Sequence, residues 1–231
     1  MGALFIGLFF MAIGWWVQSR LKSKFAQYSQ IHLTRDLTGA EIARLMLTDN
    51  NIHDVQVTCV EGELTDHYNP ANKTVNLSES VYHGRNASAA AVASHECGHA
   101  VQHATAYSML QLRSAMVPIQ SISAKVINFV FMAMFFGAFF VKGLLPVSTA
   151  LIIIIVCYAV FALFALITLP VEFDASRRAL AWIENRGIVT NQEHDMAKDA
   201  LKWAAMTYVV AAVGAITTLL YYVMIFLGRR D

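Results

Sequence analysis

The chain has 231 residues, of which 57% are hydrophobic and 14% are charged, and its formal net charge is +1. Soluble globular domains carry roughly 25% charged residues, so this composition excludes an ordinary soluble domain and indicates a membrane protein. The near-neutral charge gives no reason to expect a nucleic-acid partner. Three cysteines, one of them inside an apolar run, do not form a paired framework and suit a reducing compartment.

The first element is an uncharged run over residues 2–17 that ends in Trp15-Trp16. It lacks the basic region and the small-residue cleavage site of a secretory signal, and its charges follow it at Arg20, Lys22 and Lys24. Tryptophans at the border suit an interfacial anchor. We therefore expect residues 1–19 to form an uncleaved membrane anchor helix.

A polar stretch of about a hundred residues follows, and it predicts a small α+β domain. Thr38-Gly39-Ala40-Glu41 is a capping box that begins a helix. Three short segments follow that are bounded by turn residues, the first of which alternates apolar and polar residues, and they predict three short strands. A helix over 86–106 is predicted next. The three strand segments are Val55–Cys59, Leu64–Tyr68 and Thr74–Leu77.

The helix over 86–106 contains His95-Glu96-Cys97-Gly98-His99. Residues four apart share one helical face, so both imidazoles can reach one Zn²⁺ while Glu96 lies beside it. The motif has only three fixed letters, and the alternative is a chance pair of histidines on a solvated face. The alanine-rich helix and Gly98, a poor helix residue unless something approaches closely, favour a metal site.

Beyond Thr105 the pattern continues as helix with an interruption predicted at Pro118. Three uncharged runs follow, over 126–141, 144–171 and 203–227. The last two are long enough to cross a ~30 Å hydrocarbon core. The first is shorter, and it extends toward Ser121 if the side chain of Lys125 reaches its ammonium group to the membrane surface. Residues 172–202 between the last two runs predict two helical pieces broken near Asn185-Arg186-Gly187.

Four crossings place the histidine helix and residues 172–202 on the same side of the membrane. Of the 17 Lys and Arg residues, all but Lys142, Arg229 and Arg230 fall on that side. The positive-inside rule then predicts a multi-pass protein of the cell membrane with a cytoplasmic active site, although Arg229-Arg230 points the other way.

A catalytic zinc takes three protein ligands and keeps one open position. His103 lies about 12 Å along the helix axis from His95, too far for both to share an ion with His99. Glu172 emerges where an uncharged span ends, and an ionisable group there is costly unless it is paired or bound. The alternative to a ligand role is that Glu172 lies in the first turn of a helix, where the helix dipole favours a carboxylate. Asp174 is expected either to orient a histidine or to pair with Arg177 or Arg178. The remaining candidates are His53, His67 and His83.

His95-Glu96-x-x-His99 and Glu172-x-Asp174-Ala175-Ser176-Arg177-Arg178-Ala179 resemble the neutral zinc metallopeptidases of the YugP type, a family of bacterial membrane proteins. Leu37-Thr38-Gly39, Gly62-Glu63-Leu64-Thr65-Asp66-His67-Tyr68, Leu77-Ser78-Glu79 and Ala93-Ser94-His95 are similar to the same family. More distantly, the chain is similar to membrane gluzincins such as the CAAX-processing and heat-shock proteases. In those, a glutamate followed three residues later by alanine is the third zinc ligand.

The resemblance implies that His95, His99 and Glu172 bind Zn²⁺. Ser176 stands where the distant relatives carry Asp, so only the ligand role of Glu172 carries over. The resemblance also implies that Val75-Asn76-Leu77 is an open edge strand to which substrate adds; the alternative is a strand fully paired in its sheet. Asp66-His67-Tyr68 is either a structural turn or the source of a transition-state donor.

We therefore expect an integral membrane protein, mainly α-helical with four transmembrane helices and a small α+β gluzincin-like zinc-peptidase domain. We expect it to be a zinc-dependent endopeptidase in which Glu96 is the general base. Its partners are expected to be the lipid bilayer and a protein or peptide substrate near the cytoplasmic surface, and the sequence leaves the oligomeric state open. One rival function is a non-catalytic zinc-binding scaffold or sensor. Another is a transporter, which the scarcity of polar residues in the spans disfavours.

The sequence predicts five parts along the chain. They are an anchor (1–19), a peptidase domain (20–120), two membrane helices (121–171), a segment with the third ligand (172–202) and a last membrane helix with the C-terminus (203–231).

Overall fold

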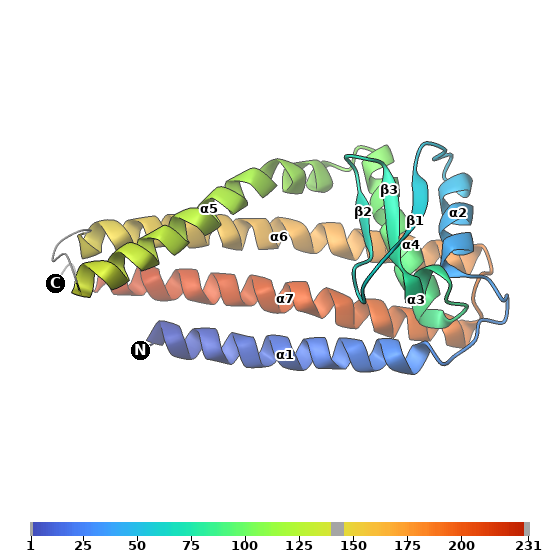
Figure 1. Cartoon of the computed structure of the whole chain (residues 1–231), viewed down its shortest axis with the longest axis horizontal. Helices are drawn as coiled ribbons and strands as arrows, with labels where there is room; N and C mark the ends of the chain where they lie inside the picture. The colour runs from blue at the N-terminus through green and yellow to red at the C-terminus, as the bar shows by residue number, and fades with distance from the viewer. Residues whose placement is uncertain (1, 140–145, 229–231) are drawn as a thin grey trace. The chain divides into compact units, whose positions relative to one another are not determined.

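The structure is a computed structural model that describes residues 2–139 and 146–228 (Figure 1). Lys142-Gly143 and Arg229-Arg230, which enter the prediction of sidedness, lie outside the described residues. The elements are α1 (Gly2–Tyr28), α2 (Gly39–Asp49), β1 (Gln56–Val60), β2 (His67–Asn69), β3 (Thr74–Ser78), α3 (Glu79–Tyr82), α4 (Ala87–Ala104), α5 (Ser108–Phe139), α6 (Val147–Asn185) and α7 (Asn191–Leu227).

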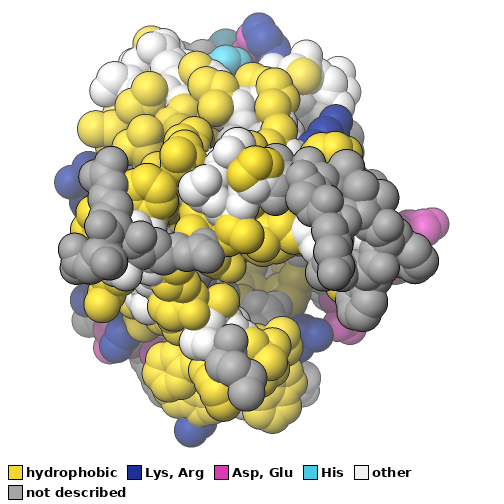
Figure 2. All heavy atoms as spheres, turned by 90° about the vertical axis from the view of Figure 1, so that its left-hand side faces the viewer, with side chains coloured by type: hydrophobic (Ala, Val, Ile, Leu, Met, Phe, Trp, Pro, Cys, Tyr) yellow, Lys and Arg dark blue, Asp and Glu magenta, His cyan; other side chains and the backbone are white. Residues whose placement is uncertain are grey.

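Four of these helices are long and apolar enough to cross a membrane, namely α1, α5, α6 and α7. The predicted interruption at Pro118 is wrong, because Pro118 lies inside the continuous helix α5. A proline removes one backbone hydrogen bond, and a helix of 32 residues keeps the rest. In Figure 2, which faces the left-hand side of Figure 1, the described surface is mainly hydrophobic and charged side chains lie toward the margins.

The chain divides into two compact units. The first comprises Met1–Trp15, Leu112–Leu169 and Tyr208–Asp231, and the second comprises Trp16–Gln111 and Pro170–Thr207. The first unit has an apolar cluster formed by Ile127, Val130, Ala150, Ile154 and Cys157. The second unit holds the sheet, the histidine helix and Glu172, so the candidate site lies within a single unit.

The sheet of the second unit has the strand order β1-β3-β2. Strand β3 pairs in parallel with β1 and antiparallel with β2, and all five of its residues are buried. Val75-Asn76-Leu77 therefore belongs to the central strand, and the expectation that it forms an open edge is wrong. The outer strand is β2, which begins at His67 and not at Leu64, because Leu64 has a φ of 56°, which is incompatible with a strand.

Helix α4 is the centre of the second unit, because apolar residues cover it on two faces. Its Ala93, Cys97 and Ala100 pack in one cluster with α2 and the sheet. Its Ala90 and Ala91 pack in another cluster with residues of α6 and α7. Small side chains allow neighbouring elements to approach closely on both sides, so the alanine-rich sequence explains the central position of α4.

Candidate metal centre

Helix α4 begins where the sequence predicts it to begin. Asn86 is the N-cap, and its side-chain oxygen accepts a hydrogen bond from the backbone N–H of Ala89 at 2.9 Å. From there the helix continues through the histidine motif to Ala104. His95, Glu96 and His99 therefore have true helical spacing, and His95 and His99 lie on one face with ring centroids 4.8 Å apart.

Helix α6 brings a carboxylate to this pair of imidazoles. The Oε2 atom of Glu172 lies 3.4 Å from Nε2 of His95 and 3.5 Å from Nε2 of His99. Glu172 is 2% exposed. In residues 2–139 and 146–228, these three side chains are the one group of His, Cys, Asp or Glu residues arranged to share a metal ion, with ligand atoms within 4.8 Å of one another.

The donor set fits a zinc ion. Zinc bonds to histidine nitrogen and carboxylate oxygen are about 2.0–2.2 Å long, and a tetrahedral angle between them separates the two donor atoms by about 3.4 Å. Both distances from Glu172 to the histidines match that separation. Two imidazoles and one carboxylate also form the ligand set of catalytic zinc sites that keep a fourth position open.

The electrostatics of the site favour a cation. Burial by itself lowers the pKa of His99, but the hydrogen bond and charge of Glu172 outweigh burial and hold that pKa above its ordinary value. The buried carboxylate of Glu172 therefore favours a positive charge beside it, which either a proton on His99 or a metal ion can supply. Metal binding at this position releases that proton, because only a neutral imidazole is a ligand.

Glu96 lies beside the three side chains and is not a member of the group. It is 9% exposed, and its Oε2 atom accepts a hydrogen bond from the backbone N–H of Tyr68 at 3.0 Å. The outer strand β2 therefore lies against the carboxylate of the histidine motif. Sequence reasoning left Asp66-His67-Tyr68 unassigned, since nothing local to those residues indicates this contact.

The rest of that segment is structural. Asp66 Oδ1 accepts hydrogen bonds from the backbone N–H of Ser78 at 2.7 Å and from its hydroxyl at 3.0 Å. Burial raises the pKa of Asp66, and the bonds from Ser78 oppose that effect only in part. His67 contacts the side chain of Asn76 on β3. These contacts fix β2 at the edge of the sheet, beside Glu96.

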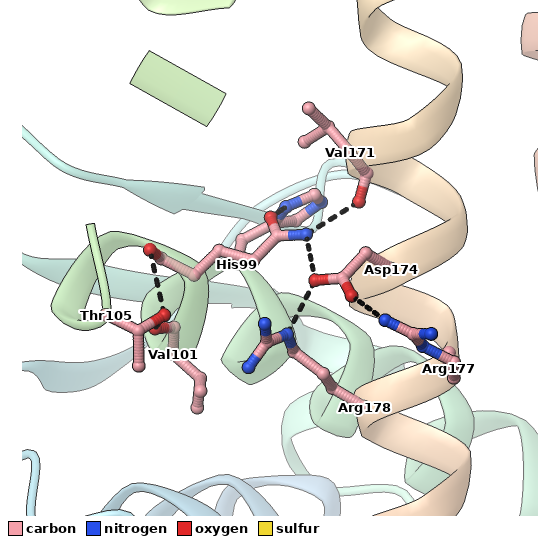
Figure 3. A network of polar contacts seen from close by, with 8 residues as sticks. His99, Val101, Thr105, Val171, Asp174, Arg177 and Arg178 are labelled. Atoms are coloured by element: carbon pink, nitrogen blue, oxygen red, sulfur yellow. Dashed lines mark hydrogen bonds and ion pairs between the residues drawn. The ribbon is translucent and has the colours of Figure 1, made fainter. Parts of the chain in front are cut away.

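Each histidine has a neutral partner on its other ring nitrogen. Nδ1 of His95 lies 3.1 Å from the hydroxyl of Ser176, and Nδ1 of His99 lies 3.0 Å from the amide oxygen of Gln102. Asp174 reaches His99 through Gln102, whose amide nitrogen donates to Asp174 Oδ2 at 3.0 Å (Figure 3). Asp174 pairs with Arg177 and Arg178 as expected, but it does not accept a hydrogen bond from a histidine directly.

The remaining histidine candidates do not join the group. His103 lies at the end of α4, where its Nδ1 is 2.7 Å from the hydroxyl of Tyr68. His53, His67 and His83 are likewise outside it. Sequence reasoning missed Gln102 and Ser176. Ser176 follows Glu172 by four residues, so a helix places both on one face, and this spacing could have indicated its role. No local feature of the sequence indicates the role of Gln102.

A family model described as "Putative neutral zinc metallopeptidase" matches residues 3–227. The chain is also 44% identical over 233 aligned positions to the "Putative membrane protease YugP" of Bacillus subtilis (strain 168), and the alignment covers 99% of each protein. No solved structure matches the chain. Both matches run through the histidine motif and through the turn of α6 that contains Glu172.

Proposed function

The chain belongs to the neutral zinc metallopeptidase family, and from this premise we propose that it is a membrane-embedded, zinc-dependent endopeptidase. The observation that carries the proposal is the convergence of His95, His99 and Glu172 from two helices, with Glu96 between the two histidines on α4. In this proposal residues 16–111 and 170–207 form a gluzincin-like peptidase domain.

The three convergent side chains would hold Zn²⁺, which when bound supplies a Lewis acid that lowers the pKa of water toward ~7 and polarises the scissile carbonyl. Glu96 would accept a proton from the attacking water as the new C–O bond forms. Glu96 would then deliver that proton to the nitrogen of the leaving amine as the C–N bond breaks. The products are one carboxylic acid and one amine, so the reaction consumes one water.

The outer edge of β2 supports a binding mode for the substrate. Tyr68 donates its backbone N–H to Glu96, so this N–H points away from β3 and toward the site. β2 is an outer strand of the sheet, and an extended peptide can pair with an outer strand through main-chain hydrogen bonds if it displaces Glu96 from the N–H of Tyr68. We propose that substrate adds to β2, in place of the Val75–Leu77 edge expected from the sequence.

The substrates we propose are membrane-associated or unfolded proteins cut near the cytoplasmic membrane surface. Four helices long and apolar enough to cross a membrane support a site held at the bilayer. Most Lys and Arg residues lie in the segments on the side of the histidine helix, and this supports a cytoplasmic orientation.

The test is cleavage of an unfolded reporter protein by the purified full-length chain in detergent, with and without a zinc chelator. Glu96→Gln is expected to abolish cleavage and to retain bound zinc, because glutamine accepts no proton. Glu61→Gln, in an exposed turn, is the matched control and is expected to cleave like the wild type. Zinc binding with no cleavage by the wild type would contradict the proposal and favour a non-catalytic zinc-binding scaffold or sensor.

A further inference from the structure

Gln102 is a fully buried amide whose hydrogen-bonding groups all have partners. It is 0% exposed and lies on α4, three residues after His99. Its oxygen accepts from His99 Nδ1 at 3.0 Å. Its nitrogen donates to the backbone oxygen of Val171 at 2.8 Å and to Asp174 Oδ2 at 3.0 Å (Figure 3).

The partners on α6 determine how the amide is oriented. A backbone oxygen and a carboxylate oxygen only accept hydrogen bonds, so the NH₂ group of Gln102 must face Val171 and Asp174. Asp174 is itself held by Arg177 and Arg178. The amide oxygen therefore has one direction left, toward His99.

This orientation determines which nitrogen of His99 carries the proton. An amide oxygen cannot donate, so Nδ1 of a neutral His99 must be the protonated nitrogen. The lone pair of His99 is then on Nε2, the atom that lies 3.5 Å from Glu172. Ser176 imposes no such choice on His95, because a hydroxyl both donates and accepts.

The same amide also joins the two helices of the site. Its contacts on α6 are with residues 171 and 174, which flank Glu172. Gln102 thus holds the turn that carries the carboxylate against the helix that carries the imidazoles.

We propose that Gln102 is a positioning residue that sets the tautomer of His99 and the register of Glu172, so that both ligand atoms face the metal. The proposal rests on the proposed zinc site, and it concerns metal binding before any cleavage. Outer contacts of this kind change metal affinity by about 10–100-fold when they are removed.

The first experiment compares Gln102→Leu with the matched control Gln111→Leu, which changes an exposed glutamine of α5. Zinc affinity is measured by competition with a chelator, and the visible absorption of bound Co²⁺ reports the coordination geometry. Gln102→Leu is expected to bind zinc about 10–100-fold more weakly with an altered Co²⁺ spectrum, while the control matches the wild type. An unchanged affinity and spectrum in Gln102→Leu would overturn the proposal.

Gln102→Glu distinguishes the role of the amide oxygen, which contacts His99, from the role of the amide nitrogen, which contacts α6. A carboxylate still accepts from Nδ1 of His99 but no longer donates to Val171 and repels Asp174. We therefore expect zinc affinity between that of the wild type and that of Gln102→Leu, together with a lower unfolding temperature. Zinc binding as weak as in Gln102→Leu would contradict the role assigned to the tautomer.

A measurement on the wild type keeps the proposal testable if Gln102→Leu does not fold. Nitrogen-15 NMR of the histidine rings in the zinc-loaded protein is expected to show Nδ1 of His99 protonated and Nε2 bound to metal. Metal on Nδ1 would overturn the proposal. A wild type that binds zinc through Nε2 without cleaving protein would contradict the endopeptidase proposal alone, so the two failures are distinguishable.

Discussion

Gly98 of α4 lies directly against the backbone of Ala175 of α6. A Cβ atom added to Gly98 would be 2.6 Å from the carbonyl oxygen of Ala175, closer than real Cβ atoms come to backbone. The glycine between the two histidines therefore permits the close approach that brings Glu172 to the imidazoles. Sequence reasoning expected such an approach from this glycine, and the structure identifies the neighbour.

Gly98→Ala tests this contact. In an exposed helix interior, alanine is more stable than glycine by about 1 kcal/mol, whereas overpacking a buried contact costs about 1–3 kcal/mol. We expect a lower unfolding temperature and weaker zinc binding, because the α4 and α6 backbones must separate. Gly14→Ala in α1 is the control, since nothing in the described structure lies within 4 Å of that position. A higher unfolding temperature for Gly98→Ala would refute the contact.

Glu172→Ala tests the third ligand. Removing one of three protein ligands is expected to lower the zinc-to-protein ratio of the purified chain, measured by elemental analysis. Glu184→Ala, on the same helix and exposed, is the control and is expected to keep the wild-type ratio. If Glu172→Ala also keeps that ratio, Glu172 is not a ligand.

His103→Ala tests the exclusion of the third histidine of α4. His103 contacts the hydroxyl of Tyr68 and lies outside the metal group. We expect the variant to bind zinc with wild-type stoichiometry and affinity in the same chelator competition. A substantial loss of zinc would show that His103 is a ligand and would contradict the arrangement described above.

The capping box of α2 predicts a dependence of stability on pH. Hydrogen bonds from the backbone N–H and the hydroxyl of Thr38 hold the pKa of Glu41 below its ordinary value of 4.5. Because the folded-state pKa is the lower one, the stabilisation is complete well above pH 4.5 and is lost as the pH falls through the folded-state pKa. The side chain is 45% exposed, so the contribution is at most about 1 kcal/mol.

We therefore expect the difference in unfolding free energy between the wild type and Glu41→Ala to be constant from pH 6 to 8 and to shrink toward pH 3. Chemical denaturation across this range measures the difference. A difference that grows on acidification would contradict the assigned direction of the pKa shift.

The features that sequence reasoning predicted correctly depend on residues close together in the chain. The capping box at Thr38, the start of the histidine helix after Asn86 and the break between α6 and α7 are each set by local residue type. The four membrane-length helices follow from uncharged runs in the same way. The convergence of Glu172 on the histidines was predicted from the cost of a charge at a membrane edge and from family resemblance.

The features that sequence reasoning missed depend on contacts between distant residues. The central position of β3 depends on its pairing with both β1 and β2, and strand composition does not determine that order. Gln102 bonds to residues 69 and 72 positions away, and a lone glutamine in a helix carries no mark of such partners. The contact between Tyr68 and Glu96 uses a backbone N–H, which every residue except proline possesses.

The most direct test of the central claim is a crystal structure of the zinc-loaded full-length protein with anomalous data collected at the zinc absorption edge. We predict one anomalous peak bonded to Nε2 of His95, Nε2 of His99 and the carboxylate of Glu172, with Glu96 nearby and not bound. A peak held by other residues, or no peak between α4 and α6, would contradict the account.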